Sequence, residues 1–319
     1  MPTLFWTGKI SLPLKIMMNM VAVIAWVTGN ARNSSAMKDR MKDGYDGKYS
    51  NYIDKYDELA SFHYEKISDI LIQKIDCKGK EIIDVGCGTG ILSFLALDKG
   101  ASKLSCVDIS KLMLEKCKRK SITKGYTSDL ISFHEGDAER LPISDATCDV
   151  VFLNMVLGMV PNQQATIAEL ARILRPGGTI ALSAHGPAHY REAIEANLKS
   201  MNMRYFFGHR FEFWPRDEKE IKTFFMNAGL GNIQTKRLTW IDKFENGGEA
   251  FDFLASTSGL WWYHRLPPEI RSKETEKSRT YFQRKNITQI TSDVVFASGL
   301  KIDSHNKANS ADSKSRADD

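Results

Sequence analysis

The sequence predicts an α/β fold in which buried strands alternate with helices. Three β-branched residues, Ile82, Ile83 and Val85, lead into glycines at alternate positions, and a mostly apolar run from 91 to 97 follows. This order indicates a strand, a tight turn and the start of a helix. Other apolar runs typical of strands span 103–109, 131–134, 149–154, 179–184, 231–240 and 291–300. Helical spacing of apolar residues is found at 59–71, 111–120 and 167–174.

The glycine loop at 86–90 constrains the ligand most strongly. Its glycines permit positive φ and a close approach of the backbone to a ligand. A dinucleotide fingerprint needs Gly-x-Gly-x-x-Gly, whereas the third glycine here comes one place early. Asp84 would repel phosphates at this loop but suits an ammonium or sulfonium group. Asp108 ends the second strand, at about the distance where a ribose-binding acid follows such a loop. We therefore expect a nucleoside with a cationic tail.

These residues resemble the class I S-adenosylmethionine-dependent methyltransferases, whose first motif matches Asp84-Val-Gly-Cys-Gly-Thr-Gly90 closely. Three further motifs follow in the order typical of the family. They are Val107-Asp-Ile-Ser110, Glu135-Gly-Asp-Ala-Glu-Arg-Leu-Pro142 and Leu174-Arg-Pro-Gly-Gly178. The resemblance covers roughly residues 45–300 and is strongest over 80–185. Within the class, the chain is most similar to the small-molecule branch that includes the ubiquinone and menaquinone C-methyltransferases.

The resemblance implies a Rossmann-like methyltransferase fold, with a seven-stranded, mostly parallel sheet and helices on both faces. It also implies S-adenosylmethionine as the cofactor and S-adenosylhomocysteine as its product. In this family the glycine loop, here Gly86, Gly88 and Gly90, approaches the methionine part of the cofactor. Asp84 would hold the amino end of the methionine part, and Asp108 would bind the ribose hydroxyls.

The resemblance also assigns the adenine side of the site. Asp137 would hold the adenine amino group and Ala138 would supply a backbone contact, although an acid in a turn often caps the following segment instead. The remaining expected cofactor contacts are Tyr56, Cys87, Ile109, Asn154 and Met155.

The end of the fourth strand argues against macromolecular substrates. Asn154 and Met155 stand at its carboxyl end, where open α/β sheets bind ligands. The chain there reads Asn-Met-Val-Leu, which departs from the Asn-Pro-Pro-Tyr type of motif that marks methylation of adenine or glutamine amino groups. The net charge of +5 is modest, and residues 1–48 carry seven basic and three acidic residues. No basic run is dense enough to predict nucleic-acid binding.

The cysteines indicate a reducing compartment. There are five, an odd number without a Cys-x-x-Cys pair, which argues against a disulfide framework or a zinc site. Cys106 and Cys148 lie in or beside strand-like runs, and we interpret them as small core residues. The prediction is a cytoplasmic protein.

Residues 1–48 are predicted to be a helical extension followed by a linker. Residues 16–27 are mostly apolar and follow Lys9 and Lys15, so a secretory signal is one interpretation. A membrane span needs about 20 apolar residues, and this run is shorter. We favour a helix that packs on the active-site mouth over one that lies at a membrane surface. Residues 34–48 are polar and contain two glycines, as is typical of a linker.

Residues 49–302 are predicted to form the methyltransferase domain. Within it, residues 186–290 contain a helical, aromatic-rich cap, which we expect between the fifth and sixth strands. Aromatic side chains cluster at 204–216 and 261–264, where they either fill the core of the cap or form an apolar pocket. Residues 303–319 have the composition of a disordered tail.

Methyl transfer from a sulfonium is a single displacement, so the enzyme must chiefly align the acceptor and exclude water. A general base is needed only when the acceptor must lose a proton. The leading candidate is His185, which follows the strand at 179–184. The other candidates are His189, His63 and His264. Tyr49 is expected to orient the acceptor, and it would share one helix face with Tyr56, either closing over the cofactor or packing on the core. No metal-ligand spacing is visible.

The sequence thus predicts methyl transfer from S-adenosylmethionine to a small, partly apolar acceptor by in-line displacement. One alternative is a membrane-peripheral quinone or lipid methyltransferase that docks through residues 16–27. A second is a non-catalytic module that binds S-adenosylmethionine. A third is another use of the cofactor, such as transfer of its aminopropyl arm, which no residue pattern requires.

Overall fold

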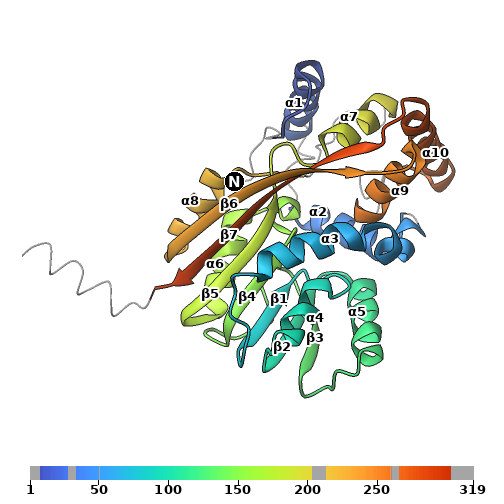
Figure 1. Ribbon diagram of the computed structural model, residues 1–319. Coiled ribbons are helices and arrows are strands. Elements are labelled where there is room, and N and C mark those ends of the chain that lie inside the picture. Colours follow the sequence, from blue (N-terminus) through green and yellow to red (C-terminus); the bar gives the residue numbers. More distant parts are fainter. Residues whose placement is uncertain are drawn as a thin grey trace, which may run out of the picture.

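The computed structural model describes residues 8–27, 34–49, 51–202, 213–258, 260 and 266–302. A seven-stranded sheet forms its centre, in the order β3-β2-β1-β4-β5-β7-β6 (Figure 1). The strands are β1 Glu81–Val85, β2 Lys103–Asp108, β3 Ile131–Glu135, β4 Cys148–Asn154, β5 Leu174–His185, β6 Leu230–Lys243 and β7 Gln289–Lys301. The first five are parallel, and β7 runs antiparallel to both of its neighbours. The predicted seven-stranded, mostly parallel sheet is confirmed.

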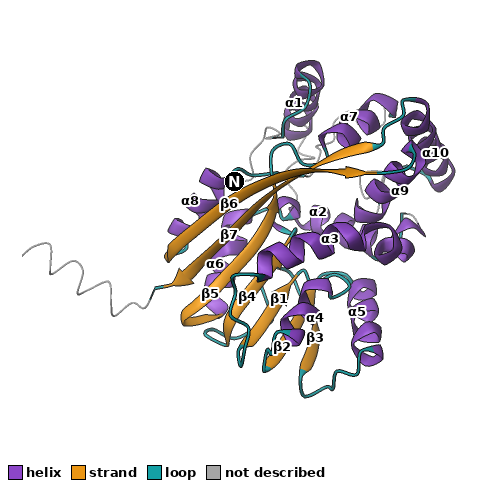
Figure 2. Cartoon of the chain, in the orientation of Figure 1, coloured by secondary structure: helices purple, strands orange, loops and turns teal. Residues whose placement is uncertain are grey.

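Alternation of side chains along the strands creates a hydrophobic core on each face of the sheet. In β1, Ile82 belongs to one core cluster, whereas Ile83 and Val85 belong to the other. The first face is covered by α3 Tyr56–Ile72, α4 Ile91–Asp98 and α5 Lys111–Thr123 (Figure 2). The second face is covered by α6 Gln163–Ile173 and α8 Glu218–Asn227. This is the helix–sheet–helix layering that continuous apolar strands require.

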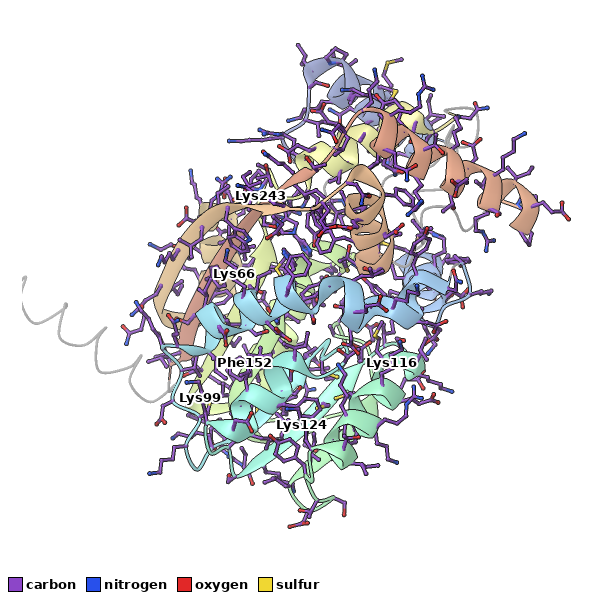
Figure 3. All side chains as sticks on the ribbon, turned by 45° about the vertical axis from the view of Figure 1, so that its right-hand side comes forward. Lys66, Lys99, Lys116, Lys124, Phe152 and Lys243 are labelled. Carbon is purple, nitrogen blue, oxygen red and sulfur yellow. The ribbon has the colours of Figure 1, made fainter. Side chains whose placement is uncertain are left out.

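Fully buried Phe152 of β4 lies between the helical layers, and Figure 3 shows it within the sheet. Among the described helices, none is both long and apolar enough to cross a membrane.

The last two strands extend past the others, with 14 residues in β6 and 13 in β7. Their far ends carry α7 Arg191–Ser200, α9 Gly247–Ser258 and α10 Pro268–Arg284 (Figure 1). The prediction of one cap between the fifth and sixth strands is therefore wrong in part, because α9 and α10 lie between β6 and β7. Residues 204–212 and 261–264 of the predicted aromatic clusters, and the predicted tail 303–319, lie outside the described residues.

The N-terminal region contains α1 Leu12–Val27 and α2 Ser34–Tyr45. The prediction of a linker at 34–48 is wrong for its first twelve residues. Met37 and Met41, one helical turn apart, are 4% and 8% exposed and pack with Trp214. Burial of these two methionines stabilises the helix even though the segment is mostly polar, because helices in proteins are stabilised mainly by tertiary packing.

Tyr49 and Tyr56 do not share a helix face, contrary to the prediction. A short 3₁₀ helix, η1 Asn51–Lys55, lies between them, and α3 begins only at Tyr56. Lys55, just before α3, makes no side-chain capping bond to it. The two tyrosines are seven residues apart, but this separation spans the 3₁₀ helix and not two turns of a single α-helix.

Candidate active site

The glycine loop joins β1 to α4 with three residues at positive φ: Gly86 at 69°, Gly88 at 55° and Gly90 at 89°. A Cβ on Gly86 would lie 2.3 Å from Cγ2 of Val156, and one on Gly90 would lie 2.6 Å from Sγ of Cys117. These two glycines are required by packing. At Gly88 a Cβ would meet no described atom within 4 Å, because this residue faces a pocket. The loop therefore offers bare backbone to a ligand.

Asp84 lies beneath the loop and is 1% exposed. Its Oδ2 accepts a hydrogen bond from Ser93 Oγ at 2.5 Å, whereas Oδ1 has no hydrogen-bond partner among the described residues. Burial raises the pKa of this carboxyl to about 7, and the nearby Cys106 adds to the effect. A buried acceptor without a partner suits a cationic donor supplied by a ligand.

Asp108 ends β2 and fixes the loop. Its Oδ2 accepts from the backbone N–H of Gly88 at 2.8 Å, and its Oδ1 accepts from the N–H of Ser110 at 2.9 Å. Burial raises its pKa to about 6, although these two hydrogen bonds oppose the shift. Asp108 and the neighbouring Ile109 both line the pocket.

The other end of the pocket is built from the turns after β3 and β4. Asp137, Ala138, Asn154 and Met155 all line it. Asn154 donates to Ser68 Oγ at 3.0 Å and accepts from Ser183 Oγ at 2.5 Å, so its amide is fixed. Met155 has a φ of 58°, which is uncommon for a residue with a side chain and is typical of functional turns.

The structure thus brings together all twelve predicted cofactor-binding residues at one pocket. They are Tyr56, Asp84, Gly86, Cys87, Gly88, Asp108, Ile109, Asp137, Ala138, Asn154 and Met155 on its lining, with Gly90 at the start of α4 behind the loop. The donors, acceptors and bare backbone of this pocket fit a nucleoside with a cationic tail. Tyr56 stacks on Tyr64 with ring centroids 5.4 Å apart.

Helix α2 covers this pocket, which the sequence did not predict. Lys38, Met41 and Tyr45 line it. Lys38 Nζ lies 2.5 Å from Asp137 Oδ2 and 2.8 Å from Glu139 Oε2. Lys42 donates to the carbonyl of Ile109 at 2.9 Å and pairs with Glu135. The i, i+4 spacing of the two lysines beside Met37 and Met41 is the signal that could have revealed this helix.

A second pocket adjoins the first, since Tyr64 and Met159 line both. Its other lining residues are mostly apolar, with a few polar groups. They are His185, Tyr190, Ile194, Asn197, Leu198, Phe213, Leu254, Thr257 and Ser258. Asn197 Oδ1 has no hydrogen-bond partner among the described residues. We call the first the cofactor pocket and the second the acceptor pocket.

The two predicted catalytic residues lie in different places. His185 lines the acceptor pocket, where burial lowers its pKa to about 3 and the nearby His63 adds to the effect. Its Nδ1 has no partner among the described residues. Tyr49 lines neither pocket; its hydroxyl donates to Asp43 at 3.2 Å, and the Arg271 guanidinium lies over its ring.

Three cysteines gather beneath the glycine loop, although the sequence showed no metal-ligand spacing. The Sγ atoms of Cys87, Cys106 and Cys117 all lie within 4.8 Å of one another. All five cysteines are free and buried. The expectation that Cys106 and Cys148 are core residues is confirmed, with exposures of 0% and 1%.

Comparison with known proteins identifies the fold. Residues 83–182 match the family described as methyltransferase domain. This stretch of the chain is therefore similar to a methyltransferase domain. It is 32% identical over 148 residues to a malonyl-[acyl-carrier protein] O-methyltransferase of Hamiltonella defensa, covering 46% of this chain and 54% of the relative. It is 33% identical over 152 residues to a demethylmenaquinone methyltransferase of Symbiobacterium thermophilum, covering 47% and 58%. The chain therefore spans little more than half the length of these relatives.

A solved structure shares the methyltransferase fold with this chain. It is a phosphoethanolamine N-methyltransferase of Haemonchus contortus in complex with phosphomonomethylethanolamine and S-adenosylhomocysteine. The TM-score is 0.53 at 13% identity, over 82% of this chain and 61% of that one. S-adenosylmethionine is the methyl donor of class I methyltransferases, and the cofactor pocket described above suits it.

Proposed function

We propose that this protein transfers a methyl group from S-adenosylmethionine to a small, partly apolar acceptor. The observation that carries the proposal is the pair of adjoining pockets, one that presents the carboxylates of Asp84 and Asp108 and one that is mostly apolar, which share Tyr64 and Met159. A ligand in each pocket would meet its neighbour at this junction. Such juxtaposition converts a bimolecular displacement into an effectively intramolecular one.

The chain's own groups suit the parts of the cofactor. The ionised carboxylate of Asp84, with Oδ1 unpartnered among the described residues, would accept hydrogen bonds from the methionine ammonium. Asp108 would bind the ribose, and Asp137, with the backbone of Ala138, the adenine. When bound, the sulfonium supplies an activated methyl group and leaves as a neutral thioether. Helix α2 would exclude water from this pocket through Met41 and Tyr45.

The acceptor pocket supports a partly apolar acceptor. Ile194, Leu198 and Leu254 supply apolar surface, while Asn197 and His185 each carry a buried atom without a described hydrogen-bond partner. These atoms would orient a polar group of the acceptor. We retain His185 as a residue that positions the acceptor, because its lowered pKa makes it a weak base. Tyr49 would act only through the packing around α2, since it lies with Met37 and Met41.

The membrane-peripheral alternative has its own support in α1. Its exposed residues Leu12, Ile16, Met20, Val23 and Val27 recur every three or four positions, so they form one apolar stripe. A helix of this kind can lie in a membrane surface. Replacing Ile16 and Met20 with Gln should reduce binding to anionic liposomes. Ser35→Gln on α2 is the control, and unchanged binding of the double variant would exclude this role.

The proposed compartment is the reducing cytoplasm, which the five buried free cysteines support.

The main proposal is tested by measuring cofactor binding and S-adenosylhomocysteine formation. The acceptors are 4-alkylphenols and hydroquinones with increasingly long alkyl chains, compared with phosphoethanolamine as a strongly polar acceptor. We expect micromolar binding of S-adenosylmethionine and faster turnover of the apolar acceptors. Absence of cofactor binding would refute the proposal. Tight binding without turnover of any acceptor would favour the non-catalytic module instead.

A further inference from the structure

Three buried side chains from distant parts of the sequence form a hydrogen-bonded line. The Tyr190 hydroxyl lies 3.1 Å from His63 Nε2, and His63 Nδ1 lies 2.9 Å from Asp242 Oδ2. His63 comes from α3, Asp242 from β6, and Tyr190 from the residue that precedes α7. Their exposed fractions are 0%, 7% and 6% respectively. Such a line of groups can carry a proton.

Asp242 determines which atoms donate and which accept the hydrogen bonds along this line. It accepts from Trp240 Nε1 at 2.9 Å and from Ser292 Oγ at 2.5 Å, in addition to its contact with His63. Burial alone would raise its pKa, but the hydrogen bond and charge of His63 and the other donors lower it. An ionised Asp242 can only accept, so His63 Nδ1 must donate to it. In the neutral imidazole, Nε2 is then the acceptor of the Tyr190 hydroxyl proton.

The open end of the line is at the acceptor pocket. Tyr190 is a lining residue there, and it also hydrogen-bonds Tyr64, which lines both pockets. Tyr190 adopts a φ of 56°, and its backbone N–H donates to the Thr291 carbonyl at 2.8 Å. Strained conformations of this kind persist where surrounding contacts over-determine them, and they concentrate at functional sites.

The other two buried histidines near the pocket lack this arrangement. His189 Nδ1 faces the backbone of Asp293, and its Nε2 has no partner among the described residues. His185 likewise has no carboxylate among its described hydrogen-bond partners. Of the described histidines that adjoin the acceptor pocket, only His63 therefore has both a carboxylate that stabilises its imidazolium form and a hydroxyl that reaches the pocket.

We propose that Asp242, His63 and Tyr190 form a proton relay that deprotonates the acceptor. The acceptor would then be a weakly acidic hydroxyl compound, such as a phenol, hydroquinone or enol. This inference rests on the methyl transfer proposed above. A carboxylate acceptor is already ionised near neutral pH and needs no base, whereas a phenol with a pKa near 10 does.

The relay accounts for the acceptor's proton and electron pair without any further reactant. As the acceptor's O–H bond breaks, its proton passes to the Tyr190 oxygen while the Tyr190 proton passes to His63 Nε2. His63 becomes an imidazolium, which Asp242 stabilises. The acceptor would keep the electron pair of the broken O–H bond and use it to form the bond to the methyl group, whose bond to sulfur would break with its electron pair left on the sulfur. The proton returns through Tyr190 to solvent when the product leaves.

The test compares two acceptors that differ in acidity. 4-Methylphenol is protonated at pH 8, whereas 4-nitrophenol is largely ionised. Tyr190→Phe should lower kcat/KM for 4-methylphenol by about 10²-fold or more, the range typical of general base catalysis. It should lower kcat/KM for 4-nitrophenol by less than about threefold. Tyr64→Phe is the matched control, because it keeps the ring that packs edge-on against His63, with centroids 5.1 Å apart, and removes a hydroxyl that has no described hydrogen bond to His63. Its effect should be the same for both acceptors.

A second measurement needs no turnover. The absorbance of 4-nitrophenol reports its ionisation, so titration of cofactor-free protein with this probe at pH 6 measures the bound phenolate fraction. Asp242→Asn should lower that fraction at least about threefold relative to the native protein, and S-adenosylhomocysteine affinity should stay within about twofold. Failure of cofactor binding by the native protein would refute the proposed function, not the relay alone.

Three outcomes would overturn the relay while leaving the proposed function intact. The first is an equal loss on both acceptors in Tyr190→Phe, which indicates a purely structural role. The second is an unchanged phenolate fraction in Asp242→Asn. The third is turnover of octanoate, a carboxylate probe, together with no turnover or binding of either phenol.

Discussion

Asp84 offers the most direct link between stability and cofactor binding. Its pKa is raised from the ordinary value of 3.8 to about 7, chiefly by burial. One tenfold change in a proton equilibrium corresponds to about 1.4 kcal/mol, so an ionised Asp84 destabilises the ligand-free fold by roughly 4 kcal/mol. Asp84→Asn removes this charge and keeps the acceptor of the Ser93 hydroxyl. It leaves a buried amide N–H, which costs about 1–3 kcal/mol.

We therefore expect Asp84→Asn to stabilise the ligand-free protein by about 2 kcal/mol at pH 8.5, or roughly 4–8 °C in Tm. The sign follows from proton binding. Between about pH 4 and pH 7 the folded protein holds a proton on Asp84 that the unfolded chain releases, so rising pH destabilises the native protein alone. The advantage of the variant should shrink as pH falls through this window, vanish near about pH 5 and reverse near pH 4, where only the cost of the buried amide remains.

The assay is thermal unfolding at several pH values, with and without S-adenosylhomocysteine. Asp69→Asn, an exposed position on α3, is the control and should change Tm little at any pH. With ligand, the order should reverse, because the native carboxylate gains its ammonium partner and the variant does not. A variant less stable than the native protein at pH 8.5, or one that keeps full ligand affinity, would refute this reasoning.

Other predictions concern the loop and the helix above it. Gly88→Ala should cost roughly 1 kcal/mol for its positive φ yet weaken S-adenosylhomocysteine binding more than tenfold, because its Cβ enters the pocket. Gly86→Ala should destabilise the fold by roughly 3 kcal/mol, because its Cβ would clash with Val156; equal chemical-denaturation curves for the two variants would contradict this. Lys42→Met should speed S-adenosylhomocysteine release about two- to fivefold in stopped-flow measurements. This factor corresponds to the free energy that a partly exposed ion pair typically contributes. Lys48→Met, which breaks only the local pair with Asp43, should leave release unchanged, and an equal effect of both would exclude α2 as the cover of the pocket.

The sheet and the cofactor pocket could be predicted because their signals are local. Apolar runs such as 149–154 fix the strands, and acids at their carboxyl ends must meet at one edge of a parallel sheet. Asp84 and Asp108 were thus placed from spacing and family resemblance alone. Their raised pKa values were not, since burial depends on the packed helices.

Other features depend on contacts that no local pattern encodes. Helix α2 was mistaken for a linker because Lys38, Asp39 and Arg40 dominate its composition, while its two buried methionines gain meaning only beside Trp214. His63 lies 127 residues from Tyr190 and 179 from Asp242, so its role was not distinguishable from that of the other histidines. The three clustered cysteines likewise come from separate elements.

The central claim is that Asp108 and the glycine loop hold S-adenosylmethionine, Asp108 at its ribose and the loop at its methionine part. Asp108 also fixes the N–H groups of Gly88 and Ser110, so the test needs two substitutions. Asn keeps one acceptor for the loop, whereas Ala keeps none. Both lose the carboxylate that would bind two ribose hydroxyls.

The decisive measurement is calorimetric titration of S-adenosylmethionine and S-adenosylhomocysteine into the native protein, Asp108→Asn and Asp108→Ala. We predict tight binding to the native protein, a loss of about 10-fold in Asp108→Asn and at least 100-fold in Asp108→Ala, as expected for one and two charge-assisted hydrogen bonds. Absence of binding to the native protein, or affinities unchanged in both variants, would contradict the account.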